Sequence, residues 1–407
     1  MPELVFGVSA GSEWGGVAPF PRSNRQGPNL GLRLPFVVGG LPGGVPRSLS
    51  RPSNRLNEGA QAHSSVQLIG GRLSRFWEEW VKITLDQWVL DVVRHGYELD
   101  FARPLRDFFM ISPCGPREKQ LLIAETVNHL RALGAILPVP PDETRTGRYS
   151  IYFLVPKKEG TFRPILDLKR VNKALHVPRF RMETLRSVIA AVHKGEFLAS
   201  LDLAEAYLHI GIRERHQRYL RFMVLGEHYQ FCALPFGLAT APRVFTKVLV
   251  VVAAFLRRQG ILVHPYLDDW LIRAKSETEC NRAVRLVIQQ LQSLGWVVNF
   301  AKSQLLPSQR LEFLGARFDT LVGKVFLTRQ RMEHLMFQVQ WLLDLQLPTA
   351  WDYLQVIGHM VSTLEMVPWA FAHMRPLQRA LLSRWDQKSE DYGVQLPLLE
   401  PAWSSLS

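Results

Sequence analysis

The most constraining feature of this sequence is a pair of adjacent aspartates inside an apolar stretch. Asp268 and Asp269 follow Tyr266-Leu267, with the apolar residues 261–263 before them and 270–272 after them. This pattern predicts two strands joined by a tight turn, which holds two carboxylates at the edge of a sheet. Like charges this close repel each other, and hard oxygen ligands of this kind suit Mg²⁺. Adjacent aspartates are also ordinary turn residues, so the turn alone leaves both interpretations open.

A third carboxylate ends another apolar run. Residues 197–201 are apolar or small and lead into Asp202. A lone aspartate at the end of a strand is usually a turn or cap residue. If the two strands lie side by side, however, Asp202 joins Asp268 and Asp269, and three carboxylates are enough for two metal ions about 4 Å apart. Such a pair of ions activates an attacking hydroxyl and stabilises the leaving oxygens in an in-line displacement at phosphorus.

A hairpin with a strongly basic tip precedes these acids. Strands are predicted over residues 152–155 and 162–168, joined through residues 157–161. From 157 to 181 the sequence has eight Lys or Arg residues and two acidic residues. Arg163 and the lysines can hold a triphosphate, because a guanidinium offers a fork to phosphate oxygens and an ammonium offers a point charge. The alternative is a solvated strand edge that lysines protect from aggregation.

The segment between the two acidic strands predicts a hairpin and then a helix. Strands are expected over residues 219–225 and 229–233, with a turn at 226–228, and a buried helix is expected over 244–255. A further helix is expected after the capping-box pattern Ser276-Glu277-Thr278-Glu279. This order of elements predicts an antiparallel sheet backed by helices, that is, an α+β fold.

Composition narrows the classes of partner and compartment. The chain has 407 residues, 47% of them apolar, and 49 Lys+Arg against 36 Asp+Glu give a net charge of +13. This charge favours a polyanionic partner such as nucleic acid. The three cysteines, Cys114, Cys232 and Cys280, fit neither a disulfide framework nor a zinc site, and they indicate reduced thiols in an intracellular protein. We expect no secretory signal and no membrane span.

The organisation along the chain is uneven. Residues 1–71 contain 13 of the 28 glycines and 8 of the 26 prolines, and we expect this tail to be disordered. An N-terminal extension with short helices is expected over residues 72–117. A helix is predicted over residues 118–133, with Gly134 as its C-terminal cap. The apolar spacing over residues 332–384 is also helical.

Six motifs in chain order resemble those of a reverse transcriptase. They are Phe-Leu-Val-Pro-Lys-Lys (153–158), Arg-Pro-Ile-Leu-Asp (163–167), Ser-Leu-Asp (200–202), Leu-Pro-Phe-Gly (234–237), Tyr-Leu-Asp-Asp (266–269) and Phe-Leu-Gly (313–315). Together with the Trp-rich segment 70–90, the amino-acid sequences of these motifs most resemble those of the enzymes of DIRS-type and LTR-like retrotransposons. The resemblance covers roughly residues 70–400. It implies a right-hand polymerase with fingers and palm over residues 118–321 and a helical thumb or connection over 322–407, and it implies that a ribonuclease H domain is absent or truncated.

The resemblance assigns roles to individual residues. It makes Asp202, Asp268 and Asp269 the ligands of two Mg²⁺ ions, with Mn²⁺ as an alternative, and the main-chain carbonyl of Leu203 completes the shell. It makes Tyr207 the aromatic gate that blocks a ribose 2′-hydroxyl, so that the product is DNA. The remaining implied roles are triphosphate binding by Lys157, Lys158 and Arg163, orientation of their hairpin by Asp167, contact with the nascent pair by Phe236 and Gly237, assistance to pyrophosphate departure by Lys302, and support of the primer end by Phe313, Leu314 and Gly315.

The implied activity is RNA-directed DNA polymerisation by two-metal transfer of dNTPs to a primer 3′-hydroxyl. The implied partners are an RNA template, a DNA primer or duplex and dNTPs, with an element-encoded recombinase and nucleocapsid-like proteins as further partners, and no membrane. We expect the protein in the cytoplasm, the nucleus or both. Two alternatives stay open: an inactive or truncated relic of the polymerase fold that only binds nucleic acid, and an RNA-directed RNA polymerase. Against the latter stand Tyr207 and the leucine before the paired acids.

Overall fold

A computed structural model describes residues 67–156, 162–367 and 369–397 of the chain. Lys157 and Lys158, predicted to bind a triphosphate, therefore lie outside the described residues, as does the tail over residues 1–66. None of the helices in the described parts combines the length and the apolar character that a bilayer crossing needs. The three cysteines are all described, and each is a free thiol, as predicted.

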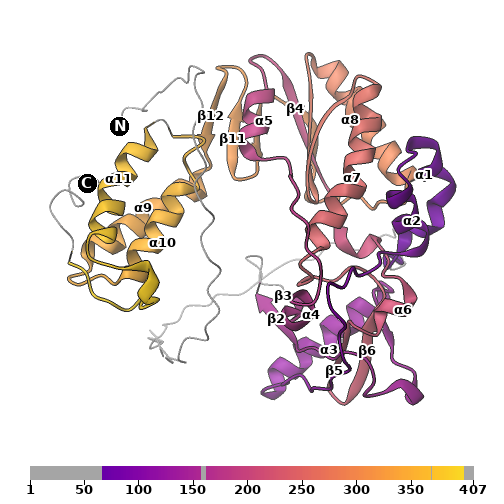
Figure 1. Ribbon diagram of the computed structural model, residues 1–407. Helices are drawn as coiled ribbons and strands as arrows, with labels where there is room; N and C mark the ends of the chain where they lie inside the picture. Colours follow the sequence, from indigo (N-terminus) through magenta and orange to yellow (C-terminus); the bar gives the residue numbers. More distant parts are fainter. Residues whose placement is uncertain (1–66, 157–161, 368, 398–407) are drawn as a thin grey trace, which may run out of the picture. The chain divides into compact units, whose positions relative to one another are not determined.

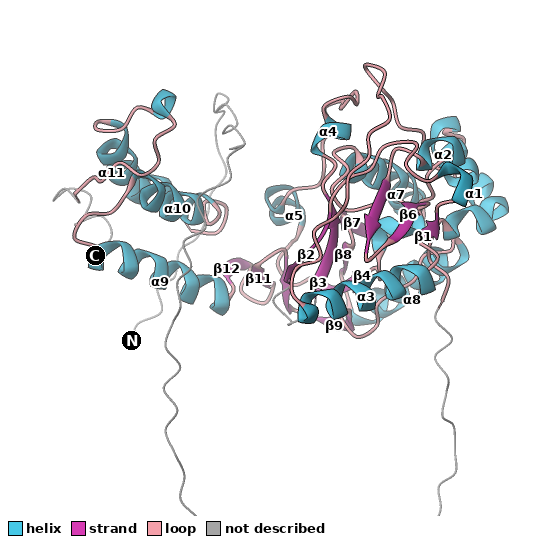
Figure 2. Cartoon of the chain, turned by 90° about the horizontal axis from the view of Figure 1, so that it is seen from below, coloured by secondary structure: helices cyan, strands magenta, loops and turns pink. Residues whose placement is uncertain are grey.

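A four-stranded antiparallel sheet carries the acidic turn, in the order β7-β8-β4-β9. Its strands are β4 (Phe197–Asp202), β7 (Leu262–Tyr266), β8 (Asp269–Ala274) and β9 (Gln304–Ser308). The helices α7 (Ala241–Arg258) and α8 (Glu277–Ser293) pack against it (Figures 1 and 2). Both faces of β8 are buried, because Trp270 and Ile272 enter one apolar cluster and Leu271 enters another. The predicted antiparallel sheet backed by helices is confirmed.

Apart from β4, the strands that precede α7 form a second sheet and a separate hairpin. The sheet has the order β1-β6-β5, with β1 (Ile136–Pro138), β5 (Arg221–Val224) and β6 (Glu227–Phe231), and the hairpin pairs β2 (Tyr152–Pro156) with β3 (Phe162–Leu166). The turn expected over residues 226–228 was placed too late. Leu225 and Gly226 both have positive φ and close a two-residue turn whose twist matches that of the strands, so Glu227 and His228 belong to β6.

One long helix, α3 (Arg117–Ala132), precedes these strands, and short helices follow along the chain. They are η2 (Pro141–Glu143), α4 (Lys169–Asn172), α5 (Leu185–Ala191), η3 (Ala206–His209) and α6 (Glu214–Gln217). The helix predicted over residues 118–133 is confirmed as α3, and Gly134 follows it with its N–H donated to the Arg131 carbonyl. The predicted buried helix over 244–255 is also present, and as α7 it is longer at both ends.

A three-stranded sheet follows β9, with β10 (Arg310–Phe313), β11 (Ala316–Asp319) and β12 (Lys324–Leu327). The helices α9 (Arg329–Asp344), α10 (Ala350–Val361) and α11 (Ala370–Leu382) follow, and the turn η4 (Gln387–Ser389) comes after them. These helices bury a core of their own around Leu342, Tyr353 and Leu377. The helical pattern predicted over residues 332–384 is confirmed as three helices.

The N-terminal extension begins to pack earlier than predicted. Ile69 is buried, and the N–H groups of Ile69 and Gly70 both donate to the Leu133 carbonyl, at 2.9 and 2.8 Å. At Gly70 the glycine reflects a close approach of two backbones, because a Cβ there would lie 1.9 Å from the carbonyl oxygen of Gly134. The elements that follow are η1 (Arg72–Phe76), α1 (Trp77–Ile83) and α2 (Gln87–His95). The expected helical extension over residues 72–117 is therefore helical as far as His95 and irregular from Gly96 to Pro116.

Gly70→Ala should destabilise the protein, because the new methyl group meets backbone that cannot rotate away. We expect a loss of about 1–3 kcal/mol in the free energy of unfolding, measured by denaturant titration followed by circular dichroism. Gly358→Ala is the control, since Gly358 lies inside α10 with nothing within 4 Å of a Cβ. That change should stabilise α10 by about 0.5–1 kcal/mol. Equal unfolding of Gly70→Ala and the wild type would contradict the close approach.

Candidate active site

The pairing of β4 with β8 brings the predicted carboxylates together. In the antiparallel register, Asp202 at the end of β4 lies directly opposite Asp269 at the start of β8. Asp268 lies in the turn, beside Leu267, which has a φ of 53°. The Leu203 N–H donates to the Asp268 carbonyl at 3.0 Å, so the ladder continues past the strand ends. The three acids therefore meet at one edge of the sheet.

The electrostatics of this edge are set by like charges. The pKa of Asp269 is raised to about 6, first by burial and then by the carboxylates of Asp268 and Asp202, while Lys302 acts in the opposite direction. Asp268 is exposed, and Asp202 and Asp269 are half-buried. The site therefore holds negative charge that is only partly compensated by Lys302, and it is open to a ligand from the side of Asp268.

The donor set fits a hard divalent cation. Within the described residues, no three His, Cys, Asp or Glu side chains form a group that could hold a metal ion. Mg²⁺ does not need a set of three protein ligands, because it keeps several waters and binds through one or two carboxylates and the phosphates of a substrate. A cation at this edge would also relieve the repulsion that raises the pKa of Asp269. Asp202, Asp268 and Asp269 are the residues that would hold it.

Tyr207 packs against two aromatic rings. It lies in η3, with its ring centroid 5.2 Å from that of Phe236 and 5.1 Å from that of Phe245. Burial and then the charge of Asp268 raise the pKa of its phenol to about 12, so the hydroxyl stays neutral. Arg163 of β3 lies over the other aromatic partner, with its guanidinium carbon 5.2 Å from the Phe236 ring centroid. Three predicted substrate residues, Arg163, Phe236 and Tyr207, are thus adjacent.

The loop that carries Phe236 and Gly237 is tied to α4. Gly237 has a φ of 103°, and a Cβ there would lie 2.3 Å from the Leu166 carbonyl oxygen at the end of β3. The Asn172 side chain donates to the Gly237 carbonyl and accepts from the Ala239 N–H, both at 2.8 Å. Sequence reasoning missed Asn172, since a single amide on a four-residue helix carries no local signal.

The predicted residues Asp167, Phe313, Leu314 and Gly315 lie at or just after the ends of β3 and β10. The carboxylate of Asp167 accepts from the Lys169 N–H at 3.2 Å and lies 3.8 Å from the Lys169 ammonium. Phe313 is buried in an apolar cluster at the end of β10, so it can support the following turn but not touch a ligand. Leu314 and Gly315 form that turn, both with positive φ.

Residues 297–303, just after α8, hydrogen-bond to the backbone beside Asp202. The Asn299 N–H donates to the Asp202 carbonyl at 2.8 Å, and the Ala204 N–H donates to the Val297 carbonyl at 2.9 Å. The Ser303 hydroxyl accepts from the Asp202 N–H at 3.0 Å. Because most of these bonds are made by the backbone, no residue type in the sequence indicates them.

Comparison with known proteins identifies the domain. Residues 155–318 match the family model described as reverse transcriptase (RNA-dependent DNA polymerase). The chain contains a reverse transcriptase domain. The match begins in β2 and ends in β11, so it includes the acidic edge, the Tyr207 turn and the loop held by Asn172.

Relatives with the same domain are transposon polyproteins of Schizosaccharomyces pombe. The chain is 30% identical to the Transposon Tf2-3 polyprotein over 161 residues and 29% identical to the Transposon Tf2-7 polyprotein over the same length. Each match covers 40% of this chain but only 12% of the polyprotein. The likeness therefore concerns the reverse transcriptase domain and not the polyproteins as wholes.

Solved structures share the fold. A foamy viral protease-reverse transcriptase in complex with double-stranded DNA superposes with a TM-score of 0.59 and 18% identity, covering 82% of this chain and 58% of that one. A second, in complex with an RNA/DNA hybrid, gives 0.55 and 17%, covering 82% and 46%. The predicted α+β, right-hand polymerase fold is confirmed.

Asn172→Ala should free the loop after Phe236 without unfolding the domain. Loss of two hydrogen bonds at a half-buried site should cost about 1–2 kcal/mol locally. We expect faster hydrogen exchange at the Ala239 amide, measured by mass spectrometry or NMR, with the exchange of α7 unchanged. Asn172→Asp keeps the acceptor for the Ala239 N–H and should protect that amide partly, and Lys173→Ala serves as the neighbouring control. Unchanged exchange at Ala239 in Asn172→Ala would show that this side chain does not hold the loop.

Proposed function

We propose that this chain is an RNA-directed DNA polymerase of a retrotransposon that adds dNTPs to the 3′-hydroxyl of a primer. The observation that carries the proposal is the meeting of Asp202, Asp268 and Asp269 at one sheet edge, inside a domain that matches the reverse transcriptase family. Tyr207 stands beside this edge, since its phenol is close enough for the charge of Asp268 to act on it.

The acidic edge supports two-metal nucleotidyl transfer. When bound, two divalent ions, Mg²⁺ or Mn²⁺, would favour the alkoxide form of the primer 3′-hydroxyl and stabilise the charge of the departing pyrophosphate. The protein's part is to hold three carboxylates at fixed positions on β4, β8 and their turn. The backbone bonds of Leu203 and Asn299 keep the two strand ends from separating.

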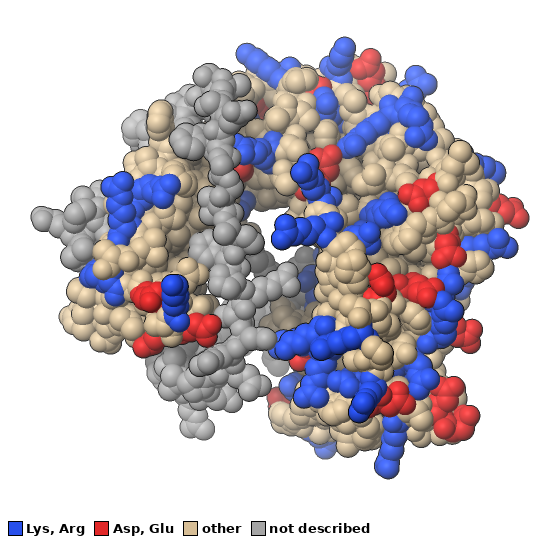
Figure 3. All heavy atoms as spheres, viewed as in Figure 1, with Lys and Arg blue, Asp and Glu red and all other residues tan. Residues whose placement is uncertain are grey.

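The basic residues around this edge suit a triphosphate. Arg163 is exposed on β3, so its guanidinium can offer a bidentate fork to phosphate oxygens. Lys302 acts on Asp269 from a different part of the chain, on the segment after α8. Lys and Arg side chains also cover much of the surface around α4 (Figure 3). A nucleotide bound between Arg163 and Lys302 would place its phosphates at the acids.

The gate supports selection of deoxyribonucleotides. The Tyr207 ring is restrained by its contacts with Phe236 and Phe245. An aromatic ring held in this way fills the space that a ribose 2′-hydroxyl would need. The phenol stays neutral at physiological pH, so it excludes by volume and not by charge.

The template and the helical C-terminal part complete the proposal. The net charge of +13 suits a polyanion, and one structural neighbour was solved with an RNA/DNA hybrid.

We assign α9, α10 and α11 to a thumb that grips the duplex, since α9 leaves Met332, Met336 and Phe337 exposed. From the amino-acid sequences of its motifs, we propose that the chain is encoded by a DIRS-type retrotransposon, with Tf2-like elements as relatives of the domain. We also propose that the enzyme works in the cytoplasm or nucleus beside the other proteins of its element.

Asp268→Asn should abolish primer extension while leaving duplex binding intact. The change keeps the shape of the turn but removes one ligand charge, so we expect a loss of at least about a hundredfold in kcat/KM for dNTPs on an RNA template with Mg²⁺. Asp142→Asn, on the exposed turn η2, is the matched control and should extend primers normally. Normal extension by Asp268→Asn would refute the two-metal assignment. A wild-type chain that binds duplex but extends nothing would instead support the inactive relic.

Tyr207→Val should admit ribonucleotides. Removing the ring opens the space beside the sugar, so the ratio of kcat/KM for dNTPs to that for rNTPs should fall by about tenfold or more in single-nucleotide extension. Tyr219→Val removes a half-buried tyrosine whose ring contacts Phe101 and His216, away from the acids, and should leave the ratio unchanged. An unchanged ratio in Tyr207→Val would remove the gate from the proposal. A wild type that prefers rNTPs would favour an RNA polymerase.

A further inference from the structure

The N-terminal extension over residues 69–96, which lies outside the matched residues 155–318, packs against the back of the nucleotide site. Three of its groups make hydrogen bonds to this part of the domain. The Gly71 N–H donates to the Leu208 carbonyl in η3 at 2.9 Å. The Arg72 side chain donates to the Gly295 carbonyl at 2.9 Å, and the Trp80 indole donates to the Leu294 carbonyl at 3.0 Å. The extension therefore binds both the turn that carries Tyr207 and the end of α8.

Trp80 sets the position of a second tryptophan. Its ring centroid lies 6.4 Å from that of Trp296 in an edge-to-face arrangement, and both side chains are buried. Among the described residues, the Trp296 indole N–H has no hydrogen-bond partner. The orientation of Trp296 is therefore determined by the rings that pack on it.

Trp296 in turn contacts Phe245 and His209. Its ring centroid lies 5.5 Å from that of Phe245, which packs on Tyr207, and 5.0 Å from that of His209, which shares η3 with Tyr207. His209 is locked in one tautomer, because Nδ1 donates to the Ala206 carbonyl and Nε2 accepts from the Val297 N–H. Burial lowers the pKa of His209 to about 4, which keeps it neutral in this arrangement.

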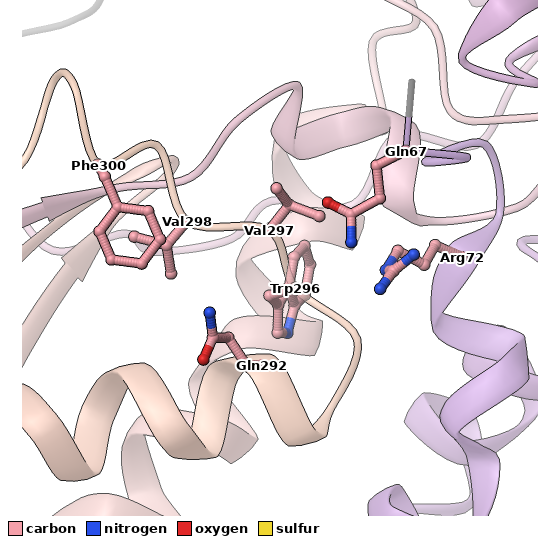
Figure 4. Close-up of a pocket in the computed structure, with 7 residues that line it drawn as sticks. All are labelled: Gln67, Arg72, Gln292, Trp296, Val297, Val298 and Phe300. Atoms are coloured by element: carbon pink, nitrogen blue, oxygen red, sulfur yellow. The ribbon is translucent and has the colours of Figure 1, made fainter. Parts of the chain in front are cut away.

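Space beside Trp296 makes the support from Trp80 necessary. A pocket of about 340 Å³ opens next to Trp296, and its wall also includes Gln67, Arg72, Gln292, Val297, Val298 and Phe300 (Figure 4). Figure 4 shows Arg72 and Gln292 on opposite sides of the Trp296 ring. If Trp80 is removed, the indole has room to shift, and Phe245 and η3 lose the surface that they pack on.

We propose that Trp80 is a positioning residue for nucleotide selection, acting through Trp296, Phe245 and His209 on the Tyr207 gate. This inference rests on the proposed polymerase function, and it makes the N-terminal extension a working part of the sugar-selecting site. The line of contacts runs from α1 to Tyr207 without a gap, and each ring in it is buried or half-buried.

The test compares Trp80→Leu and Trp80→Phe with Trp77→Leu in the full chain. Trp77 lies one turn earlier in α1 and packs on Arg94 instead of Trp296, so it is a matched control. The measured quantity is the ratio of kcat/KM for dNTPs to that for rNTPs. We expect it to fall by about two- to tenfold in Trp80→Leu, which is the range that loss of an aromatic contact gives, and to stay unchanged in Trp77→Leu. Trp80→Phe keeps a ring and should recover most of the ratio.

A purely structural role predicts a different outcome. If Trp80 only stabilises the fold, kcat/KM falls equally for both nucleotides, the ratio is constant, and the proposal is overturned. If Trp80→Leu does not fold, Trp80→Met provides the same comparison in a double-mutant cycle with Tyr207→Val. Its effect on the ratio should vanish once the gate is absent, and an effect that persists overturns the proposal. A wild-type chain that extends no primer overturns the proposed function itself, which separates the two failures.

Discussion

The antiparallel pairing of β4 with β8 is the constraint on which the site depends. Side chains alternate between the faces of a sheet, so a slip of one residue would move every side chain of β8 to the opposite face. Trp270, Leu271 and Ile272 are all fully buried, which makes such a slip costly. The same register sets Asp202 opposite Asp269. Burial of apolar side chains thus determines where the carboxylates stand, although the carboxylates repel one another.

That repulsion is tolerated because hydrogen bonds and core packing hold the turn between β7 and β8 in one conformation. Leu267 adopts a left-handed conformation that a leucine side chain disfavours, and Asp269 holds its proton more tightly than usual. The Leu203 and Asn299 hydrogen bonds fasten the two strand ends, and the core on both faces of β8 prevents them from spreading. A site that is unfavourable by itself therefore persists, and a bound divalent cation would convert its unfavourable charge into binding energy.

The features predicted correctly from the sequence are those with a local signal. The acidic turn, the helix over residues 118–133 and the helical character of residues 332–384 follow from apolar periodicity and turn residues, which act over a few positions. The glycine at residue 70 was misread because composition does not distinguish a flexible glycine from one that admits a second backbone. Asn172 and the segment around Val297 had no signal, because their partners lie far away in the sequence or bond through the backbone.

The proposed catalytic unit is therefore wider than residues 155–318, which match the family. Residues 155–318 contain every carboxylate and ring of the proposed site, yet the turn that carries Tyr207 also accepts a hydrogen bond from Gly71, and α8 ends against Trp80. Hydrogen bonds made by buried groups cannot be lost without leaving a carbonyl unsatisfied, so these contacts are costly to remove. A chain that began at residue 155 would keep the acids but expose Trp296 and η3 on the side that residues 69–96 now cover. If Tyr207 is the proposed gate, the position of its ring, and with it the choice of sugar, depends on that cover as well as on the acids.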